Sequence, residues 1–442
     1  MRWWWWIAAS LGGYLLLYAT ARTETTLLLG LWGGVIVLYG LLLRARGTLP
    51  FTLLLIAAVL FRLLALVNLP TLSDDIYRFI WDGRLLAHGY NPFLYLPSEI
   101  LDTPIAAQAG LTEALFQKLN SPQYYTVYPP LLQGWFAVSA TLGGVSELAT
   151  AFWLRLPIFL GEGGTFWLLY RLLKLMNQDQ NTAQRSVLVY ALTPLVHVEL
   201  VGNVHYEGLT ICFLLAALYF YKKQKDLPSA TFLGLAAGVK LLPLIFLPAL
   251  LEKGHWRKNL TYAVGAAVTF GVPFLFFFDR AIVENISTSL DLYFRRFEFN
   301  ASLYYLMREI GTLILGYNPI ALIGPFLALV ALSLVLFFSW SQRLKLTLPE
   351  RWLFALTAYL LCATTVHPWY VVPLIALSVL TRFGFPIIWS VMLPLTYVSY
   401  GGGGSHENLW IVAVEYCVVL GWMAWEVRGT VKYKKSHQKS DF

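Results

Sequence analysis

The sequence predicts an all-α polytopic membrane protein, a bundle of roughly 13 transmembrane helices with amphipathic helices on the extracytoplasmic side. Of the 442 residues, 58% are hydrophobic and only 13% are charged, whereas a soluble domain carries about twice that charged fraction. Apolar runs close to the roughly 20 residues that span a bilayer recur along the whole chain. The net charge of +8 comes from basic residues in short loops between these runs. This pattern marks cytoplasmic loops and argues against nucleic-acid binding as the role of the charge.

The first part of the chain predicts three helices and then a long loop. The helices are expected at Trp3–Ala19, Thr25–Leu43 and Phe51–Val67. Arg44 follows the second helix, so the positive-inside rule places that loop in the cytoplasm. Residues 69–128 then form the longest stretch without a clear spanning segment, which we interpret as a functional extracytoplasmic loop.

The middle of the chain predicts shorter and interrupted helices. A helix opening at Pro130 and ending near Leu142 is short for a crossing, and a longer one covers Ala151–Leu173. The motif VGNVHYEG is expected at the outer tip of a helical hairpin. Around Lys240, two half-length apolar pieces flank GVKLLP. About 25 residues cannot make two full spans, so we expect a broken or re-entrant pair enclosed by protein.

The last part of the chain predicts a second outer loop, residues 279–318, between further helices. These helices are expected at Leu260–Phe278, Pro319–Trp340, Trp352–Val366, Trp369–Leu380, Phe385–Tyr400 and Leu409–Trp425. Both termini are then cytoplasmic. We expect one membrane domain over residues 1–427 and a basic cytoplasmic tail over residues 428–442.

One stretch, LSDDIYRFIWDGRLLAHGYNPF at residues 72–93, breaks the apolar pattern with several carboxylates. At about 3.6 residues per turn, Asp75 and Asp82 share a helix face with Arg78 beside both. An apolar stripe on the other face predicts an amphipathic helix at the membrane surface. Ser73 is a good N-cap, and acids in a first helical turn are often simple capping residues. Both interpretations, capping and chemistry, fit this stretch.

The predicted topology brings most of the conspicuous polar side chains to the extracytoplasmic side or the outer half of the bilayer. They are Asp74, Asp75, Asp82, Tyr128, Asn203, His205, Glu207, Lys240, Arg295, Arg296, Asn300, Arg308 and His367. Ionisable groups near membrane depth are costly and tend to be functional. A carboxylate can take a proton from a sugar hydroxyl, and cations can bind a phosphate leaving group. The set is therefore typical of glycosyl transfer from a lipid phosphate sugar.

Each of these residues also has a structural interpretation. Lys240 can extend its amine from a helix end towards water, and His367 can form local hydrogen bonds before Pro368. Arg295 and Arg296 can rest on lipid headgroups. A further acid, Glu162 in the sequence GEGG at residues 161–164, is expected to form hydrogen bonds inside the bundle. The cysteines have no metal-ligand spacing, and we expect no metal and no cofactor.

The motifs SDDIYRFIWDGRLLAHGYNPF, TVYPPLLQ, GVKLLP, FEFNASLYYL and TTVHPWY cover about residues 70–370. In this order they resemble the membrane-integral glycosyltransferases of the GT-C fold, above all the mannosyltransferases that use polyprenyl- or dolichyl-phosphate mannose. The resemblance implies an aspartate base in the first outer loop, and Asp74 matches it by position. The family often has Asp-x-Asp, whereas here Asp74 and Asp75 are adjacent. Either can therefore be the base, and a metal bridged by them is disfavoured.

The resemblance and the residues together predict a site. The catalytic residues are Asp74 and Asp75, and the donor phosphate is expected to bind Lys240, His367, His205, Arg295 and Arg296. Substrate binding is assigned to Tyr77, Arg78, Asp82, Tyr128, Asn203, Glu207 and Asn300.

The predicted reaction is transfer of a hexose, expected to be mannose, from a polyprenyl-phosphate donor to an extracytoplasmic lipid or glycan acceptor. The resemblance implies that this transfer inverts the configuration at the anomeric carbon. A multi-pass protein of the bacterial inner membrane is the expected setting, with membrane lipids as neighbours and no nucleic acid. The alternative function is a transporter or flippase for a lipid-linked or polar substrate. A transporter is expected to have charges near the midplane and an internal repeat, and the sequence shows no convincing repeat. A non-glycosyl transferase on the same scaffold is a third possibility.

Overall fold

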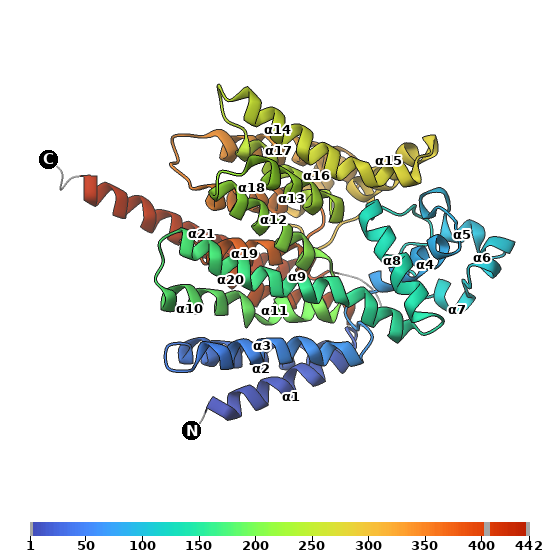
Figure 1. The fold of residues 1–442 in the computed structure, drawn as a ribbon, viewed down its shortest axis with the longest axis horizontal. Coiled ribbons are helices and arrows are strands. Elements are labelled where there is room, and N and C mark those ends of the chain that lie inside the picture. Colours follow the sequence, from blue (N-terminus) through green and yellow to red (C-terminus); the bar gives the residue numbers. More distant parts are fainter. Residues whose placement is uncertain (1–2, 402–406, 439–442) are drawn as a thin grey trace.

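The computed structural model describes residues 3–401 and 407–438, without the side chains of residues 290, 292–296 and 430–438. Within these residues the regular structure is helical, and a single isolated β-bridge joins Phe299 to Thr365. Most of the longer helices lie roughly side by side (Figure 1). The start of α1 and the end of α21 lie at the left of that view, and α4–α7 gather at the right. The all-α prediction is confirmed.

The first helices form one side of the molecule, coloured blue in Figure 1. They are α1 (Trp3–Ala19), α2 (Thr25–Ala45), α3 (Phe51–Leu63) and the 3₁₀ helix η1 (Leu64–Val67). All three predicted helices are present. A buried ion pair of 2.7 Å joins Arg62 of α3 to Glu162 of a later helix, and the Tyr190 hydroxyl donates to the same carboxylate at 2.6 Å. Glu162 of the GEGG sequence thus has the internal hydrogen bonds that the sequence predicts.

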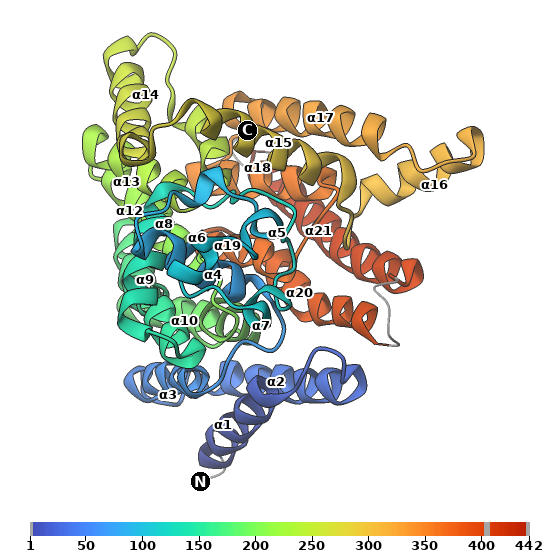
Figure 2. The same cartoon turned by 90° about the vertical axis from the view of Figure 1, so that its right-hand side faces the viewer.

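The aspartate stretch and the rest of the first outer loop fold into α4 and a series of short helices. These are α4 (Asp75–Ala87), η2 (Pro92–Leu94), α5 (Pro97–Ile100), α6 (Pro104–Gln108) and α7 (Glu113–Phe116). Three of them open with proline, whose fixed φ suits the first helical position. Thr112 caps α7 by accepting the Leu115 N–H at 3.2 Å. Figure 2 looks onto this end, with α4 near the centre and the longer helices around it.

Helix α4 is enclosed by protein rather than lying on a lipid surface. Its Phe79 stacks on Phe136 with 4.7 Å between ring centroids. A Cβ at Gly83 would lie only 2.3 Å from the Phe136 backbone oxygen, so glycine permits the close approach of the two helices. Trp81 and Asp82 are both fully buried. The sequence predicted a charged outer face on α4, but part of that face is covered by the segment that precedes α8.

The middle of the chain contains long helices with several breaks. The elements are α8 (Pro130–Gly143), α9 (Glu147–Leu175), α10 (Gln180–Ala191), α11 (Pro194–Val196), the π-helical η3 (His197–Gly202), α12 (Glu207–Lys222), α13 (Asp226–Val239), η4 (Leu242–Leu250), α14 (Trp256–Gly271) and η5 (Val272–Phe277). Lys240 is extended, with φ −150° and ψ 139°, between α13 and η4. The predicted break at GVKLLP is therefore present.

The last part of the chain contains helices within the second predicted outer loop as well as after it. The elements are α15 (Arg280–Arg296), α16 (Leu303–Leu315), α17 (Ile320–Trp340), α18 (Leu348–Cys362), η6 (Pro368–Val371), α19 (Val372–Val379), α20 (Phe385–Met392), η7 (Leu393–Tyr400) and α21 (Leu409–Gln438). Residues 279–318, the second predicted outer loop, contain the amphipathic helices α15 and α16. Helix α21 continues past residue 428 into the predicted basic tail.

Only some of the described helices are long and apolar enough to cross a membrane. They are α2, α14 with η5, α17 and the Leu409–Gly429 part of α21, and the pair formed by α10 with α11–η3 makes a fifth span if its 56° bend is allowed. These helices fit a membrane protein. The count of roughly 13 crossings is not confirmed, because many of the expected apolar segments are short, broken into 3₁₀ turns, or interrupted by buried polar residues.

Candidate active site

The start of α4 is attached to the turn between η3 and α12. His205 Nε2 lies 3.2 Å from Ser73 Oγ and 3.9 Å from Asp75 Oδ2. The Leu72 backbone N–H donates to Asn203 Oδ1 at 3.2 Å. Val204, between these two turn residues, has φ 61°. A β-branched residue rarely adopts this conformation, which costs on the order of 1–3 kcal/mol and is typical of functional sites.

The two adjacent aspartates have different partners. Asp74 forms an ion pair with Arg22, whose guanidinium lies over the Tyr400 ring at 4.7 Å. Asp75 Oδ1 accepts a hydrogen bond from the neutral Asn120 amide at 2.9 Å. Asp74, and not Ser73 as predicted, is the N-cap of α4, and its side chain makes no capping hydrogen bond. The carboxylate of Asp75 is thus the one left with neutral partners at this end of the helix.

Four rings from three distant segments form an aromatic stack beside the aspartates. Trp369 lies on His205 at 3.7 Å and on His367 at 4.4 Å, and His367 lies on Phe299 at 5.0 Å. Phe299 is held by its backbone, because its N–H donates to Thr364 O at 3.0 Å and its carbonyl accepts from Val366 N at 2.7 Å. The aromatic stack therefore joins the second outer region to the turn that carries His205.

His367 is neutral in this environment. Removal from water, with smaller contributions from His205 and Lys240, lowers the pKa of His367 from its usual 6.5 to about 3. The sequence assigned this residue to phosphate binding beside the cations. At neutral pH the ring can contact a phosphate only through a neutral N–H, so it supplies no positive charge.

Lys240 adds an ammonium group to this set of residues. Its ammonium forms an ion pair with Glu207 at the first turn of α12 and lies over the Tyr370 ring at 4.2 Å.

Tyr128 is a neutral group of the same region. Burial, and to a smaller extent the negative charge of Asp75, raises the pKa of the Tyr128 phenol well above 10. Tyr128 therefore stays protonated at neutral pH.

Two of the residues predicted to bind substrate are buried and paired with each other. Arg78 Nε donates to Asp82 Oδ1 at 2.8 Å, and Gln133 donates to the other Asp82 oxygen at 3.1 Å. Arg78 also donates to the Tyr124 and Ser121 carbonyl oxygens at 2.8 and 3.2 Å. These contacts fasten the segment before α8 onto α4. A role in substrate binding stays a prediction, and the contacts favour a structural role.

The other predicted residues lie in three different settings. Asn300 has φ 46° and directs its backbone N–H to Glu407 at 2.6 Å and its amide to Glu415 at 3.1 Å, so it binds the region of α21. Tyr77 lies under the Lys118 ammonium at 5.2 Å. The side chains of Arg295 and Arg296 lie outside the described residues.

The sequence comparison decides the family. A model described as alpha-(1->6)-mannopyranosyltransferase, N-terminal domain, of the MptA_B family, matches residues 7–252. The chain belongs to this mannosyltransferase family. The match contains Asp74, Asp75, His205 and Lys240 and ends before His367. It confirms the resemblance to GT-C mannosyltransferases and supports a mannosyltransferase function. No curated protein matches the chain.

A further acid of this mannosyltransferase, Glu199, was not identified from the sequence. It is fully buried in η3, accepts the Tyr397 hydroxyl at 2.6 Å, and has Oε2 at 3.4 Å from His205 Nδ1. The signal was available, because Glu199 interrupts the apolar run before VGNVHYEG, where an ionisable group is costly. Its π-helical setting is also typical of functional sites.

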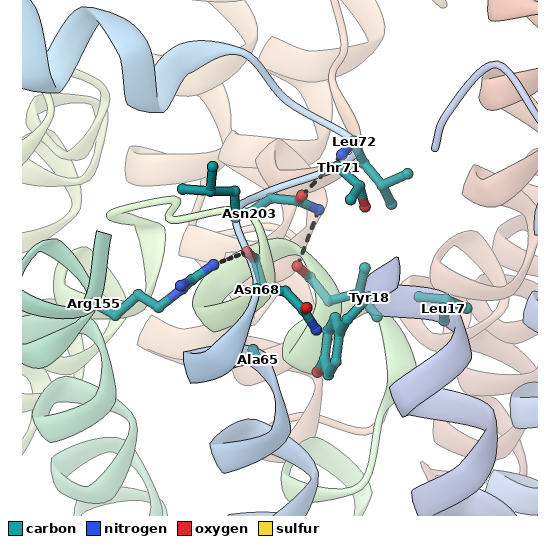
Figure 3. Close-up of a pocket in the computed structure, with 11 residues that line it drawn as sticks. Leu17, Tyr18, Ala65, Asn68, Thr71, Leu72, Arg155 and Asn203 are labelled. Carbon is teal, nitrogen blue, oxygen red and sulfur yellow. Dashed lines mark hydrogen bonds between the residues drawn. The ribbon is translucent and has the colours of Figure 1, made fainter. Parts of the chain in front are cut away.

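A cavity beside the candidate site is too small for a sugar. Asn68, Leu72, Arg155 and Asn203 line it (Figure 3). Its volume is about 10 Å³, which is the space of about one water molecule. The side chains of Asp74, Asp75 and Lys240 are themselves partly exposed, at 34%, 21% and 35%. In the residues that the structure describes, no group of three His, Cys, Asp or Glu side chains could hold a metal ion.

Proposed function

We propose that this chain transfers a mannosyl unit from a polyprenyl-phosphate donor to an acceptor hydroxyl at the extracytoplasmic face of a membrane. The observation that carries the proposal is that a carboxylate with neutral partners, Asp75, lies next to His205, while the ammonium of Lys240 lies among the same group of residues. A base for the acceptor and a cation for a phosphate are the two groups that such a transfer needs. The family description supports mannose as the sugar and α-(1→6) as the linkage.

The proposed reaction is a single displacement at the anomeric carbon. As the acceptor oxygen bonds to C1, the bond from C1 to the phosphate oxygen breaks and the phosphate leaves with its electron pair. Asp75 takes the proton of the acceptor hydroxyl. We assign this role to Asp75 rather than Asp74 because Arg22 already pairs with Asp74. Inversion to an α product requires a β-linked donor.

Lys240 is the proposed partner of the donor phosphate. With no donor bound, its ammonium pairs with Glu207. The donor phosphate is a diester with one negative charge, as the carboxylate has, and it can compete with Glu207 for the same ammonium. His367 can add a neutral hydrogen bond. His205 is proposed to act on the acceptor side, because Ser73 and Asp75 are its nearest polar neighbours on Nε2.

The extracytoplasmic location follows from the charge pattern. The start of α1 and the end of α21 lie away from α4–α7 (Figure 1). Arg44 and Arg46 lie at the end of α2 and just after it, and Lys174 and Arg185 lie at the end of α9 and in the first half of α10. Under the positive-inside rule the loops beside these residues are cytoplasmic and the site faces outward. We propose a bacterial inner membrane protein in which residues 1–427 form one domain and residues 428–442 a basic cytoplasmic tail.

The proposal is tested with the purified protein in proteoliposomes. Native mass spectrometry should find a polyprenyl phosphate bound to the protein. Incubation with radiolabelled polyprenyl-phosphate mannose and a mannoside acceptor should give a longer product whose new bond is cut by an α-mannosidase. Movement of the intact donor across the bilayer without product would favour the flippase alternative. Use of a nucleotide sugar in place of the lipid donor would contradict the proposed donor.

A further inference from the structure

The two ring nitrogens of His205 have opposite surroundings. Nδ1 lies 2.8 Å from the backbone oxygen of Glu199. A carbonyl oxygen can only accept, so Nδ1 carries the hydrogen of the neutral ring. Nε2 is then unprotonated, and it lies 3.2 Å from Ser73 Oγ and 3.9 Å from Asp75 Oδ2. Neutral His205 therefore presents a proton acceptor to the proposed base.

Glu199 places a negative charge behind this ring. Its Oε2 lies 3.4 Å from His205 Nδ1, and the whole side chain is buried. The Tyr397 hydroxyl donates to Oε1 at 2.6 Å, and the Asn203 amide lies 3.5 Å from Oε2. A carboxylate fixed beside the Nδ1–H orients an imidazole and stabilises its protonated form, as in the serine-protease triad. Trp369, stacked on the ring at 3.7 Å, limits its rotation.

We propose that Glu199 and His205 form a proton relay behind Asp75. The inference rests on the proposed function. Asp75 receives the proton of the acceptor hydroxyl while the new bond to C1 forms and the bond from C1 to the phosphate oxygen breaks. The proton then passes from Asp75 Oδ2 to His205 Nε2, which restores the carboxylate of Asp75. The imidazolium is stabilised by Glu199 until it releases the proton to water.

The distance between Asp75 and His205 allows this transfer after a small movement. The 3.9 Å between Oδ2 and Nε2 is about 1 Å longer than a hydrogen bond. Catalytic hydrogen bonds are often long before substrate binds and shorten in the complex. Glu199 does not contact the reacting atoms, so we regard it as a positioning residue for His205.

Several charged or titratable groups surround His205 and belong to the same electrostatic environment. They are Asp74 and Asp75 of α4, Glu199 of η3, Glu207 of α12, Lys240 after α13, His367 before η6, and Tyr397 and Tyr400 of η7. Changing Glu199 alone leaves the others in place. A shift in pH dependence that follows this change can therefore be assigned to the Glu199–His205 pair.

The test compares the pH profile of mannosyl transfer in the wild type and in Glu199→Gln. The glutamine keeps an oxygen for the Tyr397 hydroxyl and removes the charge. We expect kcat to fall by about 10–100-fold, which is at or below the lower end of the effect of losing a proton-transfer group, because Glu199 acts only through His205. KM for both substrates should stay within about twofold. The acid limb of the kcat profile should move to lower pH by about one unit, because the imidazolium has lost its counter-charge. An unchanged profile, or a lower kcat with the acid limb in place, would overturn the relay.

Two further variants keep the relay testable. Glu162→Gln also removes a buried carboxylate that accepts a tyrosine hydroxyl at 2.6 Å, and it should not move the acid limb. If Glu199→Gln does not accumulate in the membrane, His205→Gln replaces it and should move the acid limb down to the pH range in which a carboxylate is protonated, because only Asp75 then remains to titrate; an acid limb left in place contradicts the relay. Failure of the wild type to transfer mannose contradicts the proposed function itself. Normal transfer by both Glu199 and His205 variants contradicts only the relay.

Discussion

Asp75 Oδ2 lies 3.9 Å from His205 Nε2, whereas the neighbouring Asp74 side chain forms an ion pair with Arg22. Two acids that are adjacent in the sequence therefore have separate surroundings. Asp74 connects α4 to the segment after α1, and Asp75 faces the turn that precedes α12. This division is the reason to expect different effects when each is changed.

Loss of either partner of the Arg22–Asp74 ion pair should lower the transfer rate only modestly and to a similar extent. Both side chains are about one-third exposed, and such pairs contribute on the order of 0–1 kcal/mol. Asp74→Asn and Arg22→Gln should each lower transfer by less than about tenfold, and the double variant should be no worse than the poorer single variant. Initial rates at saturating donor, measured with Asp102→Asn as an exposed control in the same outer region, give the comparison. Additive losses would show that the two side chains act separately.

Lys240 should affect donor binding more than the chemical step. We expect Lys240→Gln to raise KM for the lipid donor by about 10–100-fold, because a charged hydrogen bond to phosphate is lost. Glu207→Gln removes the competing carboxylate and should lower that KM or leave it unchanged. The exposed Lys253→Gln serves as the control for loss of a positive charge. Unchanged donor KM in Lys240→Gln would exclude the lysine from phosphate binding.

His367 predicts a particular dependence of stability on pH. Its pKa is about 3 in the folded protein and about 6.5 in the unfolded chain. Between these values the unfolded state binds more protons, so stability is lost as the pH falls from 6.5 towards 3. The melting temperature in detergent should therefore fall less steeply over pH 7 to 4.5 in His367→Gln than in the wild type. Identical slopes for the two proteins would contradict the shifted pKa.

Adding one methyl group at Gly83, as in Gly83→Ala, should lower the stability of the folded protein. A Cβ there would lie 2.3 Å from the Phe136 backbone oxygen. Separating α4 from α8 is expected to cost about 1–3 kcal/mol. Gly83→Ala should lower the melting temperature and reduce transfer, because α4 carries Asp75. Gly163→Ala is the matched control, since Gly163 is also helical and a Cβ added there would meet no atom within 4 Å. Equal melting temperatures for the two variants would contradict the packing argument.

Much of the helical pattern could be predicted from the sequence because lipid-facing and core-facing helices share long apolar runs. Trp3–Ala19 and Phe51–Val67 have the bounds that we expected, and the break at Lys240 follows from length alone. The helices α15 and α16 were not located from the sequence, because their mixed polar and apolar pattern lacks the long apolar run used to find spans. The burial of α4 depends on a distant partner, α8, and cannot be read from its own amphipathic pattern.

The candidate site was predictable only in part. The aspartates, His205, Lys240 and His367 stand out because charged groups are rare in an apolar chain. Their pairing is not visible in the sequence, since Arg22 lies 52 residues from Asp74. The neutral state of His367 depends on the aromatic stack, which joins positions 205, 299, 367 and 369. Glu199 was missed because it lies in the apolar run before the turn and not among the polar residues of the turn itself.

The most direct measurement is single-turnover transfer from labelled polyprenyl-phosphate mannose by Asp75→Asn and Asp74→Asn, with donor binding measured on the same samples. Asp75→Asn should bind the donor as the wild type does and transfer at least about 100-fold more slowly. Asp74→Asn should keep at least about a tenth of the wild-type rate. Wild-type transfer by Asp75→Asn, or a severe loss confined to Asp74→Asn, would contradict the assignment of the base.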